Sequence, residues 1–448
     1  MPASADHEQG RAAVAAGAPG MEPSKAGDRE RGPEAPPGGP APGAEPSGVG
    51  DREPGREAAP PGPPPRTEPS QAEAARARVR ARAYGPKESS PSPPKESSPS
   101  PPDRVRARAP GRVCLIGEHT DYNQGLALAF AIAESVTVKA RRLAPGPDGE
   151  ERVRALACDF DEEDDFLLAD PPGAEGWRAF VRGMAAELAE AGLEPVGTSL
   201  RIEGGVPRGA GMSSSAALEV ALALAMLALA GTEREIGRTD LAKLCSRVEN
   251  EWAGAKTGLL DQLTSLYGEP EEAIEIDFQA VTVEPVPLRL DGWRLVTCDT
   301  GERRENASSG YNERRAECAE ACRLLGIGSL REASSEQVER LPEPLRGRAE
   351  HVLGDNDRVR RAVGALRADD MAAVAGLLNE SHRSLRDRMA ISTPTVEATV
   401  SRMLEAGAAG ARILGGGFGG SVLALLPPGV ALPAGAREAR PCGGAEIL

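Results

Sequence analysis

Four side chains suited to polar chemistry lie within ten residues of one another in residues 109–125, APGRVCLIGEHTDYNQG. They are Arg112, Glu118, His119 and Asp121, and glycines interrupt the run. Carboxylates and an imidazole accept and donate hydrogen bonds in fixed directions, which is what the recognition of sugar hydroxyls requires. A solvated charged turn is the alternative, and His119 alone would indicate little. The cluster as a whole favours a site that binds hydroxyl groups.

A second segment, residues 204–218 (GGVPRGAGMSSSAAL), runs into an Ala/Leu-rich stretch and has the features of a phosphate-binding loop. Gly209 and Gly211 let the backbone approach an anion closely, and the free amides at a helix start attract negative charge. The serines at 213–215 could cap those amides, so an ordinary serine-capped helix is the alternative. Because no Gly-Lys-Ser/Thr follows, this is no Walker A loop, and a kinase using it would need Mg²⁺ to neutralise phosphate charge.

Two further segments carry weaker signals. Asp261 lies between apolar neighbours in GLLDQ, so its carboxylate belongs either to a buried ion pair or to a catalytic centre. The run GGGFGG at residues 415–420 could form a turn that closes over a ligand, although glycine loops are common. Neither segment identifies a function by itself.

Apolar periodicity from residue 105 onward predicts both strands and helices, which indicates an α+β fold. The predicted strands are 113–116, 127–132, 135–138, 294–298 and 421–426. The predicted helices are 177–191, 213–230, 239–252 and 310–325. Glycine clusters separate these elements, so the candidate site residues lie at the ends of strands and helices.

The composition divides the chain near residue 102. Of the 40 prolines, 23 fall in residues 1–102, a stretch poor in aromatic and β-branched residues that also repeats the octapeptide PKESSPSP. Such a segment cannot bury enough apolar surface to offset its ordering entropy, so we expect residues 1–102 to be disordered. The remaining chain is long enough for two domains or for one large two-lobed unit.

Charge and cysteine content restrict the possible partners. Residues 103–448 hold 40 basic and 54 acidic side chains, and such a surface repels nucleic acid and anionic membranes. Cys318 and Cys322, four residues apart, could form a metal or redox pair, but free thiols in a reducing cytoplasm are the favoured interpretation. The first residues lack the apolar core of a secretory signal, and the apolar run at 220–230 is too short to span a bilayer. We therefore expect a cytoplasmic protein that binds neither nucleic acid nor membranes.

Taken in order, these segments resemble the motifs of the GHMP kinases and, within that superfamily, those of the galactokinase branch. GRVCLIGEHTDYNQG is similar to the sugar signature, GAGMSSSAAL to the phosphate loop and LGGGFGG to the third motif. SSGYNERRAEC at 308–318 and ESHRSLRD at 380–387 agree as well. The resemblance covers most of the chain from about residue 103. It implies a two-lobed α+β kinase fold, with an N-terminal lobe at 103–290 and a C-terminal lobe at 291–448.

The resemblance also implies a reaction and the residues that perform it. The γ-phosphoryl group of ATP would pass to the anomeric hydroxyl of galactose, with Mg²⁺ as cofactor, in a monomeric enzyme. Arg112 and Asp261 would be the catalytic pair at the reacting hydroxyl. The sugar would be bound by Arg112, Glu118, His119, Asp121, Gly258, Asp261 and Tyr311. The nucleotide phosphates would be bound by Gly209, Gly211, Ser213, Ser214 and Ser215, and Mg²⁺ by Ser215 and Glu249.

Several positions depart from the family pattern and leave alternatives open. They are Cys114, Lys256, Thr257, Met389 and Leu414, none of which is a predicted catalytic residue. A kinase for arabinose or for an N-acetylhexosamine is one alternative. The other is a sensor that binds ATP and sugar without catalysis. Such sensors lose small residues from the phosphate loop, whereas Ser215, Ala216 and Ala217 are intact here.

Overall fold

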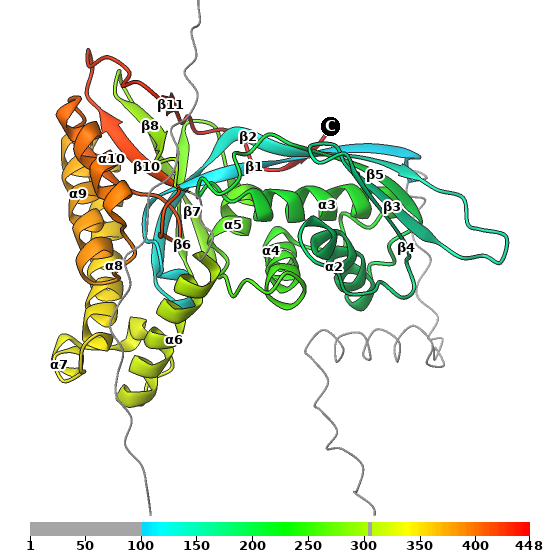
Figure 1. The fold of residues 1–448 in the computed structure, drawn as a ribbon, viewed down its shortest axis with the longest axis horizontal. Helices are drawn as coiled ribbons and strands as arrows, with labels where there is room; N and C mark the ends of the chain where they lie inside the picture. The colour runs from blue at the N-terminus through cyan, green and yellow to red at the C-terminus, as the bar shows by residue number, and fades with distance from the viewer. Residues whose placement is uncertain (1–100, 303–306) are drawn as a thin grey trace, which may run out of the picture. The chain divides into compact units, whose positions relative to one another are not determined.

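The computed structural model describes residues 101–302 and 307–448. All but the last two residues of the expected disordered tail, residues 1–102, lie outside the described residues. Within the described ranges the strands form two sheets, and helices flank both (Figure 1). The α+β class expected from the sequence is confirmed.

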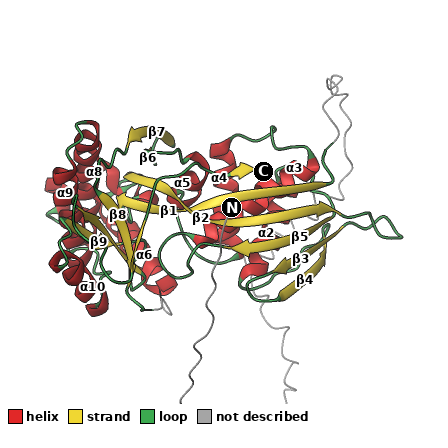
Figure 2. Cartoon of the chain, turned by 90° about the horizontal axis from the view of Figure 1, so that it is seen from above, coloured by secondary structure: helices red, strands yellow, loops and turns green. Residues whose placement is uncertain are grey.

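The first sheet comprises eight strands in the part of the chain that the structure describes (Figure 2). Its order is β12-β1-β2-β5-β3-β4, while β6 pairs with β2 and β7 pairs with β6. Neighbouring strands are antiparallel except for β3 and β5. The bounds are β1 (Arg104–Ile116), β2 (Leu126–Arg142), β3 (Arg152–Ala157), β4 (Glu162–Leu167), β5 (Thr198–Gly204), β6 (Glu272–Asp277), β7 (Thr282–Pro287) and β12 (Glu446–Ile447).

The first two strands are longer than the sequence pattern predicts. Residues 127–132 and 135–138, expected as separate strands, both belong to β2, which pairs with β1 on both sides of the exposed Ala133. The register of β1 against β2 shifts between Pro110 and Arg112, and such irregularities redirect a side chain. The strand then leads directly into the turn that carries Glu118, His119 and Asp121.

Helix α3 follows the phosphate loop and packs against β1 and β2. Its sequence, SSAALEVALALAMLALA, is apolar on every side, as expected of a helix that is covered all round. Figure 1 shows α2 and α4 on the side of α3 that faces away from the sheet, whereas α5 packs against β1 and β2 as α3 does. These helices span α2 (Trp177–Glu190), α3 (Ser214–Ala230), α4 (Arg238–Arg247) and α5 (Leu260–Tyr267). No helix in the described part of the chain, α3 included, is long and apolar enough to cross a membrane.

The helix predicted over residues 239–252 has a different geometry in its second half. Helix α4 ends at Arg247, and a π-helical turn, η2 (Val248–Trp252), continues it. Such turns are rare and occur often at functional sites, because the extra residue per turn changes where side chains lie. Here the π-turn contains the predicted metal ligand Glu249, which is 4% exposed.

The second sheet and a group of long helices form the rest of the described chain. The sheet order is β11-β8-β10-β9, and all of its pairings are antiparallel. Its strands are β8 (Arg294–Asp299), β9 (Gly410–Ile413), β10 (Ser421–Leu426) and β11 (Ala436–Glu438). The helices are α6 (Ala307–Leu325), α7 (Ser335–Val338), α8 (Leu345–Arg367), α9 (Met371–Asp387) and α10 (Pro394–Glu405), with short 3-10 turns η1 (Asp121–Asn123) and η3 (Leu330–Glu332).

The two sheets are joined by more than one crossing of the chain. Strand β12 returns to the first sheet and pairs with β1 at Ala107 and Arg108. Helix α8 packs against β1 and β2 as well as against α9. The lobe boundary near residue 290 remains a prediction, although every strand of the second sheet follows it in sequence.

Candidate active site

The thirteen residues singled out in the sequence line one cavity of about 240 Å³ in the described part of the protein. They come from the end of β1, the turn after it, the loop before α3, the π-turn, the start of α5 and the start of α6. Residues as far apart in sequence as Arg112 and Tyr311 therefore share one space. The structure brings the whole predicted set together, while the role of each residue remains a prediction.

Arg112 and Asp261 form a close ion pair at the centre of this cavity. The Arg112 Nε donates to Asp261 Oδ1 at 2.7 Å, and Nη2 lies 2.5 Å from the same oxygen. The Arg112 side chain is 6% exposed and that of Asp261 19%. Burial by itself would lower the pKa of Arg112, but the carboxylates of Asp261 and Glu118 outweigh it and raise the pKa. The arginine is thus a permanent cation. The sequence allowed Asp261 to belong either to a buried ion pair or to a catalytic centre, and an ion pair in this cavity is compatible with both.

The serine before helix α3 does not cap it, so the alternative of an ordinary serine-capped helix is not what the structure shows. Ser213, the residue before the helix, makes no side-chain cap and has a left-handed backbone (φ 59°). Its hydroxyl donates instead to Asp261 Oδ2. A capping side chain needs an extended backbone at that position, and a hydrogen bond to a carboxylate is stronger than one to a neutral acceptor. The amides at the helix start are consequently left without serine caps.

The glycines of this loop take conformations that suit a close backbone approach. Gly211 has a φ of 81°, a region that L-residues seldom adopt, and its carbonyl accepts a hydrogen bond from Arg112 Nη1. Through this bond the arginine joins the loop to Asp261. The loop, β1 and α5 are therefore held together at one point.

Ser215 and Glu249, the predicted metal ligands, lie next to each other. The Ser215 hydroxyl donates to Glu249 Oε1 at 2.7 Å, while Thr257 Oγ1 and Gln262 Nε2 donate to Glu249 Oε2 at 2.6 and 2.9 Å. Burial, and then the nearby charge of Asp261, raises the pKa of Glu249, so a cation here would relieve an unfavourable negative charge.

Oxygen donors of this kind suit Mg²⁺, which commonly takes one or two protein ligands together with phosphates and water. The described residues contain no group of three or more His, Cys, Asp or Glu side chains able to hold a metal. A cation beside Ser215 and Glu249 would thus depend on the nucleotide for its other ligands.

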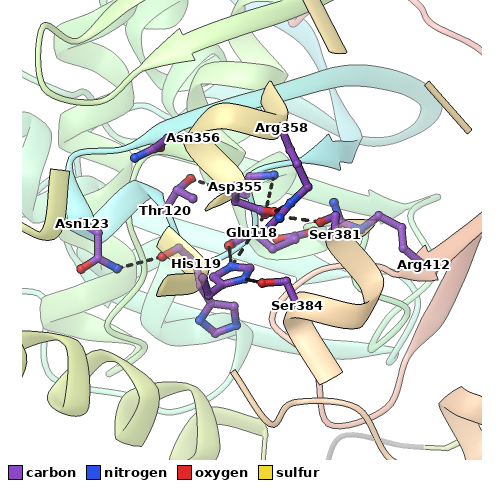
Figure 3. A network of polar contacts seen from close by, with 12 residues as sticks. Glu118, His119, Thr120, Asn123, Asp355, Asn356, Arg358, Ser381, Ser384 and Arg412 are labelled. Atoms are coloured by element: carbon purple, nitrogen blue, oxygen red, sulfur yellow. Dashed lines mark hydrogen bonds and ion pairs between the residues drawn. The ribbon is translucent and has the colours of Figure 1, made fainter. Parts of the chain in front are cut away.

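Glu118 is bound to the glycine-rich run that follows β9. Its Oε1 accepts a hydrogen bond from the Gly415 amide at 2.6 Å, and the guanidinium of Arg412 lies 3.6 Å away. Arg412 is fully buried and also donates to the Leu115 carbonyl at 2.6 Å. Figure 3 shows Glu118 among the side chains of this polar network. The third sequence motif therefore contacts the first directly.

His119 has a left-handed backbone (φ 62°), and both of its ring nitrogens lie close to polar groups. Nε2 lies 3.3 Å from the Gly416 carbonyl and Nδ1 lies 2.7 Å from the Tyr122 hydroxyl. Because a carbonyl only accepts, Nε2 carries the hydrogen and Nδ1 accepts from Tyr122. The ring also packs against Tyr311, with centroids 4.9 Å apart. The imidazole is therefore fixed in one tautomer at the cavity wall.

Asp121 lies so close to Gly258 that a Cβ atom on the glycine would collide with the Asp121 carboxylate. Its Oδ1 accepts from the Tyr122 amide at 2.9 Å. Burial raises the pKa of Asp121 to about 6, and the charges of Asp261 and Glu118 act in the same direction. Asp121 is thus a carboxyl group whose charge changes in the mildly acidic range.

Several cavity residues were not predicted as site residues. Asn312 follows Tyr311, and its Oδ1 finds no hydrogen-bond partner among the described residues. Lys256, noted only as a departure from the family pattern, also lines the cavity, as does Gly416. Asn312 could have been predicted from the sequence, because it directly follows the predicted site residue Tyr311. Gly416 belongs to the glycine run that could form a turn over a ligand, but residue type could not show that its carbonyl contacts His119.

The structure joins Cys318 and Cys322 by no disulfide. All seven, each within the described ranges, are free thiols. Cys318 is buried, and burial raises its pKa to about 12. The interpretation as free thiols is confirmed.

Comparison with known proteins identifies the family. Residues 96–142 match the galactokinase galactose-binding signature, 179–269 the GHMP kinases N terminal domain and 362–440 the GHMP kinases C terminal domain. A galactokinase from Roseiflexus sp. is 40% identical over 72% of this chain and 83% of its own length. One from Streptomyces coelicolor is 39% identical over 71% of this chain and 83% of its own.

The fold agrees with solved structures. A Lactococcus lactis galactokinase complexed with galactose is similar at a TM-score of 0.72 and 29% identity, over 84% of this chain and 99% of that one. Mevalonate kinase from Methanococcus jannaschii shares the fold at a TM-score of 0.55 and 17% identity. The two-lobed GHMP kinase fold is therefore shown, and the chain belongs to the galactokinase family.

Proposed function

We propose that this protein phosphorylates galactose at its anomeric hydroxyl, producing galactose 1-phosphate and ADP. As a member of a kinase family, it uses ATP as the phosphoryl donor. One observation carries the proposal: the Arg112–Asp261 pair connects the sugar signature to the phosphate loop. A hydroxyl bound by the signature and a phosphate bound by the loop would meet at this pair.

The geometry supports a division of roles in the transfer. Asp261 Oδ2, which accepts from Ser213, can instead accept the proton of the anomeric hydroxyl as its oxygen attacks the γ-phosphorus. Arg112, always charged, pairs with that carboxylate and would stabilise negative charge on the transferring group. Glu118, His119, Asp121, the Gly258 backbone and the Tyr311 hydroxyl would hold the sugar in place.

The nucleotide phosphates would bind at the free amides of the loop at 209–215 and the start of α3. We propose that Ser215 and Glu249 hold Mg²⁺ there. When bound, Mg²⁺ neutralises phosphate charge, which a loop without a Walker lysine cannot do alone.

The seven free thiols support a cytoplasmic location, and the origin of the complete site in one chain supports a monomeric enzyme.

The proposal is tested by ADP release across a panel of aldoses. We expect galactose to give the highest kcat/KM, with galactose 1-phosphate identified as product by NMR. Arabinose and N-acetylgalactosamine test the two alternative kinases. Binding of ATP and sugar with no ADP release from any sugar would instead support a non-catalytic sensor.

The pKa of Asp121 predicts how sugar binding depends on pH. An ionised Asp121 accepts hydrogen bonds from hydroxyls, and protonation at a pKa of about 6 removes part of that capacity. The KM for galactose should therefore rise as pH falls below 6, by about tenfold at one unit below the pKa. The measurement is the galactose KM at saturating ATP between pH 5 and 8.

The variant Asp121→Asn is the control for this pH dependence. Its galactose KM should be raised at every pH and nearly flat across the range, since the asparagine does not titrate. An unchanged pH profile in the variant would show that another group controls sugar binding.

A further inference from the structure

Helix α8 holds the turn at residues 117–126 through three side chains that do not line the cavity, of which Figure 3 labels Asp355 and Asn356. Asp355 Oδ2 accepts from the Gly117 amide at 3.3 Å. His351 Nε2 lies 3.0 Å from the Glu118 carbonyl, and Asn356 Oδ1 accepts from the Leu126 amide at 2.7 Å. The three contacts bracket the turn that carries Glu118, His119 and Asp121.

The protonation state of His351 follows from its surroundings. The Glu118 carbonyl can only accept, so His351 Nε2 carries the hydrogen and Nδ1 accepts from the Ser384 hydroxyl at 2.8 Å. The ring is fully buried. Burial lowers the pKa of His351, against the opposing charge of Asp355, and keeps the imidazole neutral. His351 is therefore a fixed donor to the backbone of Glu118.

Asp355 is held by several partners at once. Arg358 Nε donates to its Oδ1 at 2.6 Å, and the Ser381 hydroxyl lies 3.4 Å from Oδ2. Burial would raise the pKa of Asp355, but the positive charges of Arg358 and Arg412 and the hydrogen bond from Arg358 outweigh it and lower the pKa. The carboxylate is fully buried, and its position relative to the Gly117 amide is determined by helices α8 and α9.

We propose that His351, Asp355 and Asn356 are positioning residues that set the affinity for the sugar. They act on the backbone of the turn, so that its side chains reach the cavity at the spacing a sugar requires. This inference rests on the proposed sugar-binding role of the turn. The phosphate loop is held by other contacts, from Gly211 to Arg112, Ser213 to Asp261 and Ser215 to Glu249. Loss of the α8 contacts should therefore act on the sugar and spare the nucleotide.

The experiment compares His351→Leu with His351→Gln. Leucine removes the donor to Glu118, whereas the glutamine Nε2 can still donate from a similar position. We expect His351→Leu to raise the galactose KM by about tenfold or more, the effect of one lost buried hydrogen bond. The KM for ATP and the kcat should stay within about twofold of wild type, and His351→Gln should recover most of the sugar affinity.

Two further variants separate positioning from general stability. The Thr232 hydroxyl, just after α3, makes a similar side-chain contact to backbone by donating to the Leu193 carbonyl at 3.1 Å, and neither residue lines the cavity. Thr232→Val should lower the melting temperature and leave both KM values unchanged. Ser384→Ala removes only the hydrogen-bond partner of His351 Nδ1 and should raise the galactose KM by a smaller factor. This variant therefore still tests the inference if His351→Leu does not fold.

The outcomes distinguish this inference from the proposed function. A wild-type protein that neither binds nor phosphorylates galactose would overturn the proposed function. An active wild type whose galactose KM is unchanged in His351→Leu, or in Ser384→Ala if the leucine variant is unfolded, would overturn the inference alone. Equal increases in the KM for ATP and galactose would do so as well, because they would indicate a general loss of structure.

Discussion

Replacing Asp261 with asparagine is expected to reduce kcat by roughly 10²–10⁴-fold, the range for losing general acid–base assistance. Asparagine has nearly the same shape and can still accept from Ser213, but it cannot take a proton from the sugar. It also leaves the buried guanidinium of Arg112 without its main counter-charge. The measurement is kcat at saturating ATP and galactose, with binding of both ligands checked by calorimetry and folding by thermal melting.

Arg112→Ala and the double variant complete this test. Arg112→Ala alone should also lower kcat, because charge on the transferring group loses its nearest cation. The double variant should lose less than the product of the two single losses, as expected for residues that share one task. An Asp261→Asn enzyme within about threefold of wild type would remove Asp261 from the proton transfer and weaken the site assignment as a whole.

Replacing Glu249 with glutamine should have the second largest effect, a fall of roughly 10²-fold in kcat/KM for ATP. Three donors converge on its two carboxylate oxygens, from Ser215, Thr257 and Gln262. An amide cannot accept at both positions, so one of its ends would turn an N–H toward a donor or toward the metal. The Mg²⁺ concentration for half-maximal rate should therefore shift upward, and excess Mg²⁺ should restore part of the activity.

Glu219 provides a matched control for that experiment. It is fully buried behind Gln262, which donates to both glutamates, and it does not line the cavity. Burial, and then the charge of Glu249, raises the pKa of Glu219 well above its usual value, so it is held protonated. Glu219→Gln keeps a neutral group of the same shape and should leave the Mg²⁺ dependence unchanged. Equal losses in both variants would contradict a metal-binding role for Glu249.

The sequence predicted the members of the site better than their contacts. The family motifs placed Arg112, Glu118 and Asp261 in one site because each lies within a short, recognisable segment. Residue types could not show which partner each side chain selects. The sequence left open that Ser213 caps a helix, but its backbone is left-handed and its hydroxyl donates to Asp261. Such a choice depends on distant residues that share the space.

The elements that position the site were harder to predict for a similar reason. The periodicity of residues 239–252 indicated a helix, but it could not show the π-turn that contains Glu249. His351 and Asn356 lie more than 200 residues from the backbone groups they contact. On a helix rich in charged residues they look like ordinary polar positions. Strand β12 is only two residues long, so no periodic pattern could reveal it.

The contact between Glu118 and Gly415 has a consequence for the order in which the site forms during synthesis. The two residues are 297 positions apart, as are Leu115 and Arg412, which join the same two segments. At about 5–20 residues per second, the ribosome adds the later partner roughly 15–60 s after the earlier one. The turn proposed to bind the sugar therefore leaves the ribosome long before β9 and the glycine run that contact it, whereas the contacts of the loop at 209–215 with Arg112, Asp261 and Glu249 span at most 99 positions. The proposed nucleotide half of the site can therefore form earlier on the nascent chain than the proposed sugar half.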